Sequence, residues 1–85
     1  MTEAEGHIVK ARENIGFARY ALAGEYADEA GRGAYMAAFH AALALIISRT
    51  GKSPKTHSGT RSEFARLARG EPRISREQVS LLGWS

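Results

Sequence analysis

The chain has 85 residues, of which 44% are hydrophobic and 25% charged, a composition typical of one small globular domain rather than of a disordered segment. It contains no cysteine, which excludes a disulfide framework and thiolate chemistry and fits a reducing compartment. Its net charge of +3 permits contact with RNA, DNA or an acidic partner, but many proteins with no such partner carry the same excess.

The sequence predicts no membrane segment. The first ten residues, MTEAEGHIVK, are polar and partly acidic, unlike a signal peptide. No uninterrupted apolar run approaches the roughly 20 residues that a membrane span requires. The longest is Ala41–Ile47, which is a helix face only. We therefore expect one cytoplasmic domain over residues 1–85, without membrane contact.

The first predicted helix covers about Glu3–Ala23. Thr2 and Glu5 have the spacing of a capping box, in which each side chain accepts a hydrogen bond from the other residue's backbone N–H. Gly24 is a suitable residue to end the helix. Apolar residues recur at steps of three and four and predict one buried stripe: Ile8, Ala11, Ile15, Ala18 and Leu22.

A second, longer helix is predicted from a cap at Asp28 to Arg49, with Gly51 as its C-terminal stop. At 1.5 Å per residue it would be roughly 33 Å long. The stretch AYMAAFHAALALII is apolar around much of the helix circumference, which is typical of a helix at the centre of a bundle or at an interface. Because 85 residues are too few to cover such a helix, we expect a homodimer with this helix near the interface.

Two shorter helices are expected after a loop. Residues 51–59, GKSPKTHSG, contain the glycine, serine and proline that interrupt helices. Thr60 with Glu63, and Ser75 with Gln78, then have capping-box spacing. The last helix has no clear end signal, so we expect the chain to be shorter than the fold to which it belongs. With no competing strand signal, the predicted fold is an all-α, up-and-down helical bundle of four to five helices.

Positive charge is concentrated in the second half of the chain. Between Arg49 and Arg76 eight lysines and arginines are opposed only by Glu63 and Glu71. Such a region is either a solvated surface or a binding site for an anionic ligand. Within it, Lys55, His57 and Ser58 precede the helix predicted to begin at Thr60. A helix N-terminus and a lysine favour phosphate or carboxylate there. Alternatively, His57 packs on the second helix while Ser58 or Thr60 caps the third.

The second predicted helix carries a candidate groove or interface. Arg32 and His40 are eight residues apart, about 12 Å along a helix, so they share a broad face without touching. His40 is either a helix-surface or core histidine whose ring is hydrogen-bonded to a neighbouring element, or a polar group in a cleft or dimer interface. Tyr35 and Phe39 lie on an apolar face, which favours a core or interface position over base stacking.

Metal binding and nucleophilic catalysis have little support in the sequence. His7, His40 and His57 are far apart and lack the short spacing of metal ligands, so we expect no metal and no cofactor. The adjacency of Ser58 and His57 does not indicate a catalytic triad, whose members meet in space rather than in sequence. No catalytic residue is assigned.

Two separated motifs identify a family resemblance. A tyrosine-containing helix with Phe39-His40-Ala41-Ala42 is followed by Lys55-Thr56-His57-Ser58-Gly59, and the upstream GEYADEAGRGAY also fits, with Arg32 just before the tyrosine. In these features the sequence resembles the small prokaryotic HEPN-domain proteins over nearly its whole length. The resemblance implies an all-α fold and a binding partner, which would be a minimal nucleotidyltransferase or another member of a toxin–antitoxin-type module. It also implies a contribution to a nucleotide or RNA site.

The same resemblance offers an enzyme as the alternative. HEPN ribonucleases are metal-independent endoribonuclease toxins in which an arginine and a histidine from two protomers promote attack of the RNA 2′-OH on its own phosphate. Those residues lie on a late helix that this sequence lacks, which favours the binding protein. The anion-binding candidates are Lys55, His57, Ser58 and Arg61, and the groove or interface candidates are Arg32, Tyr35, Phe39 and His40.

Overall fold

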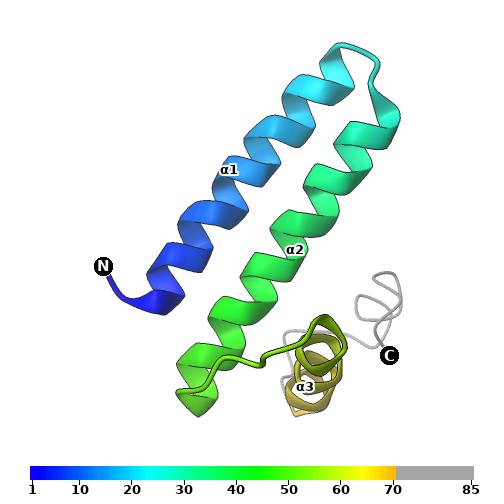
Figure 1. Cartoon of the computed structure of the whole chain (residues 1–85). Helices are drawn as coiled ribbons and strands as arrows, with labels where there is room; N and C mark the ends of the chain where they lie inside the picture. Colours follow the sequence, from blue (N-terminus) through cyan, green and yellow to red (C-terminus); the bar gives the residue numbers. More distant parts are fainter. Residues whose placement is uncertain (71–85) are drawn as a thin grey trace.

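A computed structural model describes residues 1–70, which form three α-helices: α1 (Glu3–Ala23), α2 (Ala27–Thr50) and α3 (His57–Arg69). α1 and α2 run antiparallel side by side, and α3 packs against α2 (Figure 1). No strand occurs within residues 1–70, and the predicted all-α class is confirmed. The helix predicted to begin at Ser75 lies outside the described residues, so only three of the expected four to five helices can be compared.

The boundaries of α1 are those that the sequence predicts. Thr2 Oγ1 accepts a hydrogen bond from the Glu5 N–H at 3.1 Å, and the Glu5 carboxylate accepts one from the Thr2 N–H at 3.0 Å. The bond from the Thr2 backbone, and then that involving its side chain, lower the pKa of Glu5 because they favour the charged carboxylate. The helix ends at Gly24, whose N–H donates to the Tyr20 carbonyl.

The predicted start of α2 is wrong. Asp28 does not cap this helix. Tyr26 holds the cap position without a side-chain hydrogen bond, and its N–H donates to the Ala21 carbonyl at 2.8 Å. This bond and the left-handed Glu25 (φ 67°) close a tight turn that starts the helix before Asp28. Asp28 lies in the first turn instead, where a carboxylate also stabilises the positive helix end. The predicted stop is confirmed, since Gly51 adopts φ 74° just after Thr50.

α3 also begins earlier than predicted. Its cap is Thr56, whose Oγ1 accepts the Gly59 N–H at 2.9 Å. Thr60 is not a cap: it is 1% exposed, and its hydroxyl donates to the Thr56 carbonyl at 3.0 Å. The predicted loop 51–59 is therefore too long. His57 and Ser58 belong to the first turn of α3 rather than to a loop.

The core lies on both sides of α2. Toward α3, a cluster of buried side chains joins the two helices, with Phe64 packed against it: Phe39, Ala42, Leu43, Ala65 and Ala68. Ile46, next along the same face of α2, is fully buried. Toward α1, the buried residues are small, chiefly Ala11 and Ala21 on α1 and Gly33, Ala37 and Ala44 on α2. Small side chains at such a contact let two helices approach closely.

Only part of the predicted apolar stripe on α1 is buried. Ala11 is buried and Ala18 is half-buried, whereas Ile8, Ile15 and Leu22 are 38%, 42% and 64% exposed. The three larger residues recur every seven positions, so they share one flank of α1 beside the alanine contact. α1 thus presents an apolar flank that α2 and α3 leave open.

α2 passes the length and composition test for a membrane span. It has 24 residues, with a window of mean hydropathy 1.3. The sequence prediction of no membrane segment considered only uninterrupted apolar runs. The mean hydropathy of a window is a more permissive criterion, because it tolerates a few polar residues. Because α2 also buries residues against both other helices, it has the character of a core helix, and core helices pass the same test.

Gly33 marks the closest approach of α1 and α2. A Cβ atom at this position would lie 3.0 Å from Phe17 Cδ1, 3.1 Å from Ala18 Cβ and 3.1 Å from the Asn14 carbonyl oxygen. The last two atoms are fixed by the backbone of α1, so a side chain could be accommodated only by moving the helices apart. Gly31, one half-turn earlier on α2, has nothing within 4 Å of such a Cβ.

These two glycines give a matched test of the helix contact. We expect Gly31→Ala to raise the free energy of unfolding by about 0.5–1 kcal/mol, because alanine favours the helix over glycine. Gly33→Ala should give no such gain, or a net loss, because the same preference is offset by the contacts with α1. Thermal unfolding monitored by circular dichroism measures both. Equal stabilisation by the two variants would contradict the close packing described here.

Candidate functional site

Four aromatic rings from three helices form a continuous row, here called the aromatic array: His7 on α1, His40 and Phe39 on α2, and His57 on α3. The His7 and His40 rings stack with centroids 5.0 Å apart, and their Nδ1 atoms are 2.8 Å apart. Phe39 meets His40 edge-on at 6.3 Å and contacts the His57 ring at 4.6 Å. The array brings together the Phe-His and Thr-His segments that the sequence separates.

His40 is the histidine of the array whose surroundings clearly change its pKa. It is half-buried, and burial lowers its pKa below the usual value of 6.5. The nearby His7 and Lys10 lower this pKa further, because a positive charge on either disfavours a second one on His40. The contact with His7 is the hydrogen bond to a neighbouring element that the first interpretation of His40 predicts.

The N-terminal turn of α3 presents donors to solvent. Intrahelical bonding begins with the Thr60 N–H, which donates to the Thr56 carbonyl, and Thr56 Oγ1 takes the Gly59 N–H. The N–H groups of His57 and Ser58 have no acceptor within the helix. The first turn contains no acidic residue, and both Lys55 and Ser58 are exposed beside it. This arrangement suits a phosphate or carboxylate oxygen.

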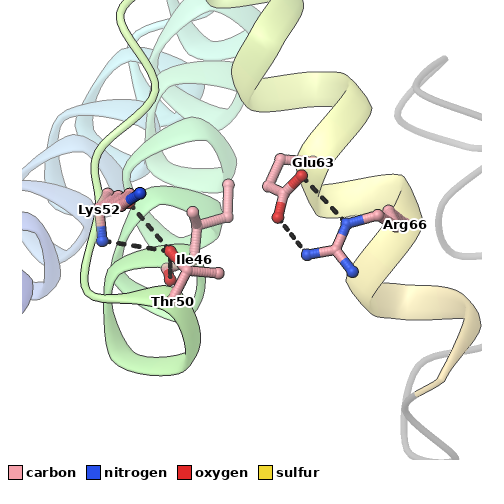
Figure 2. Close-up of polar contacts among 5 residues, drawn as sticks. All are labelled: Ile46, Thr50, Lys52, Glu63 and Arg66. Atoms are coloured by element: carbon pink, nitrogen blue, oxygen red, sulfur yellow. Dashed lines mark hydrogen bonds and ion pairs between the residues drawn. The ribbon is translucent and has the colours of Figure 1, made fainter.

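The positive charge around this turn is little opposed. Between Arg49 and Gly70 the only carboxylate is that of Glu63. Arg66 binds it through two hydrogen bonds, one of them Nε to Oε2 at 3.1 Å (Figure 2). This contact lowers the pKa of Glu63, so the carboxylate stays charged, and its charge is balanced by that of Arg66. The cations of this segment without an ion pair to any residue in 1–70 are Lys52, Lys55, Arg61 and Arg69.

The turn after α2 has a defined backbone. Thr50 Oγ1 donates to the Ile46 carbonyl at 2.8 Å and accepts the Lys52 N–H at 3.2 Å (Figure 2). Gly51 N–H donates to the Ile47 carbonyl at 2.8 Å. These bonds fix the point at which the chain leaves α2, and therefore the origin of the basic segment that leads to α3.

The four groove or interface candidates are divided between two places. Arg32 and Tyr35 line an open hollow of about 450 Å³ on the first half of α2, together with Ala27, Asp28, Gly31 and Met36. Arg32 there pairs with Glu29 at 3.3 Å. Phe39 and His40 belong to the aromatic array instead. Of the anion-binding candidates, Lys55, His57 and Ser58 are close in sequence on one turn, and Arg61 lies one turn further along α3.

His7 is the member of the array that the sequence reasoning did not select. The available signal is its place in the series Ala4, His7, Ala11, Asn14 and Ala18, whose steps of three and four mark the face turned to α2. Within residues 1–70, no group of three or more His, Asp or Glu side chains could hold a metal ion.

Comparison with known proteins adds one finding. A model of the HEPN domain family matches residues 4–83, a span that includes all three helices and both motifs. Neither the curated proteins nor the solved structures contain a significant match.

Proposed function

Because the chain belongs to the HEPN-domain family, we propose that it is a non-catalytic binding protein that holds a phosphate group of a nucleotide or RNA at the start of α3. The observation that supports this most directly is the first turn of α3. There the N–H groups of His57 and Ser58 lack helical acceptors and Lys55 is exposed beside them.

Three physical contributions favour a phosphate at this turn. The backbone N–H groups donate to its oxygens, the helix dipole attracts its negative charge, and the lysine ammonium adds a full positive charge. Arg61, one turn further on, offers the planar donor pair that suits phosphate geometry. The array places the His57 ring against Phe39, so His57 contributes its backbone and a fixed position to the site.

The proposed partner follows from the family resemblance. The partner would be a minimal nucleotidyltransferase or another member of a toxin–antitoxin-type module. It would supply the rest of a nucleotide or RNA site, and this chain would contribute the basic residues at the start of α3. We place the protein in the cytoplasm on the same grounds.

We expect the double variant Lys55→Ala/Arg61→Ala to bind single-stranded RNA more weakly and with a smaller salt dependence. Each lost phosphate contact should reduce the slope of log K against log[salt] by about 0.7, so by about 1.4 in total. Fluorescence anisotropy with a labelled single-stranded RNA between 50 and 200 mM salt measures both quantities. The matched control, Arg12→Ala/Arg19→Ala, removes the same charge from exposed positions on α1.

If both double variants lose the same affinity and slope, net charge alone attracts the RNA, and the site at α3 is contradicted. The same proteins are tested with an adenine nucleotide. If the wild type binds it and Lys55→Ala/Arg61→Ala alone does not, the ligand is the nucleotide rather than RNA.

A cleavage assay separates this proposal from the ribonuclease alternative. For a protein that only binds RNA, end-labelled single-stranded RNA incubated with the purified chain in EDTA should stay intact. Cleavage that is lost in His40→Ala or His57→Ala would instead establish an enzyme and overturn the proposal.

We also propose that the chain is a homodimer with α2 at the interface. Ala34, Ala38 and Ala41 follow steps of four and three along one face of α2, with Ala27 two turns before them, and none of the four is buried within residues 1–70. Such a face lets a second helix approach closely. The exposed Ile8, Ile15 and Leu22 on α1 provide further apolar surface for a second copy.

Light scattering at micromolar concentration should give twice the chain mass of 9.2 kDa. Ala34→Glu/Ala41→Glu should give a monomer, because a dimer would bury carboxylates without partners. Ala23→Glu, at an exposed position at the end of α1, is the control and should remain dimeric. If the wild type is a monomer, the dimer proposal is wrong, whereas the proposed phosphate site at α3 is unaffected.

A further inference from the structure

The contact between His7 and His40 requires a particular protonation state. Two imidazole nitrogens 2.8 Å apart form a hydrogen bond only when one carries a proton and the other does not. Because the contact joins the two Nδ1 atoms, one ring must be protonated at Nδ1. If both nitrogens carried protons, their N–H groups would point at each other at a distance that excludes contact.

The surroundings of the pair offer no compensation for a second proton. On α1, Lys10 is close enough to repel a positive charge on His40. Its own weak ion pair is with Glu13. The two carboxylates within a turn of His7 on its N-terminal side, those of Glu3 and Glu5, are exposed, and Glu5 accepts the Thr2 N–H. On α2, the neighbours of His40 one turn away are uncharged: Met36, Ala37, Leu43 and Ala44.

On α3 the one carboxylate, that of Glu63, is bound by Arg66. His57 lies across the Phe39 ring from His40, and Arg61 follows one turn later on α3. Protonation of both rings would therefore meet repulsion from Lys10 and find no carboxylate one turn from His40 on α2.

The geometry points to a pH-sensitive clasp: we infer that His7 and His40 share one Nδ1 proton between α1 and α2, and that protonation of both rings, which places two N–H groups in the contact, separates the N-terminal half of α1 from α2. The contact lies where α1 meets α2 through small side chains, chiefly Ala4 and Ala11 beside His7. Alanine side chains bury little apolar surface, so the histidine contact adds to what holds this end of the helix pair. The inference is independent of the proposed phosphate site.

The direction of the pH effect follows from the lowered pKa of His40. In the unfolded chain the ring takes up a proton as the pH falls through about 6.5, whereas the folded chain resists until a lower pH. The unfolded state thus binds more protons in this window. The contribution of the clasp is fully present above about pH 6.5, persists while only one ring is charged, and is lost at lower pH when the second ring is protonated as well.

Thermal unfolding between pH 8 and pH 5 tests the clasp with a matched set of variants. His40→Asn places an amide near the Nδ1 position. The amide does not titrate, and because it offers both a donor and an acceptor it can keep a hydrogen bond to His7 whether that ring is neutral or charged. We expect wild type and the control His57→Asn to lose melting temperature in parallel below pH 6.5, and His40→Asn to lose clearly less. Equal losses in all three proteins would overturn the inference.

Imidazole ¹⁵N NMR of the wild type provides a readout that needs no variant to fold. At pH 7.5 one of the two rings should be in the Nδ1–H form, which is uncommon for an exposed neutral histidine. The pair should titrate in two steps separated by about one pH unit or more, as interacting sites do. Two ordinary Nε2–H rings with independent, coincident titrations would show that no proton is shared.

Discussion

The position of α3 depends on its packing against Phe39 of α2, which combines the buried cluster with Ala65 and Ala68 and a contact of the His57 ring. α1 and α2 form a hairpin through a short turn, so their pairing is local, but α3 follows a turn and an irregular segment that could lead in many directions. The His57 ring on Phe39, at 4.6 Å, fixes the first residue of α3 against the centre of α2. The buried Ala65 and Ala68 then continue the contact. The basic turn therefore has a defined orientation with respect to the rest of the domain.

Capping and helix ends were predictable because their signals are local. Thr2 with Glu5, Gly24 and Gly51 lie within a few residues of the backbone groups they satisfy. Asp28 and Thr60 misled the prediction because each has suitable cap chemistry, while a competing interaction decides the outcome. For α2 it is the Tyr26 bond to the preceding helix, and for α3 it is the burial of Thr60, which favours Thr56 as the cap. Burial cannot be judged from a four-residue window.

The candidate site was predicted only as separate parts. The positive charge and the chemistry of Lys55, His57 and Ser58 are properties of a short segment, so the sequence contains them. The pairing of His7 with His40 joins residues 33 positions apart, and its 2.8 Å distance depends on the register of α1 against α2. That register is set by Gly33, where α1 approaches most closely. No local pattern contains this information, which is why His7 was missed.

The domain divides its chemistry between two ends of α2. The first half of α2 carries small exposed residues and the hollow beside Arg32, and its surface suits another helix more than a charged ligand. The second half is enclosed by α3, and the chain that leaves it supplies nearly unopposed positive charge. His40 and Phe39 lie between these regions, in contact with both neighbouring helices. A change in how α1 or α3 packs on this central pair would therefore reach both surfaces, because α2 is the one helix that they share.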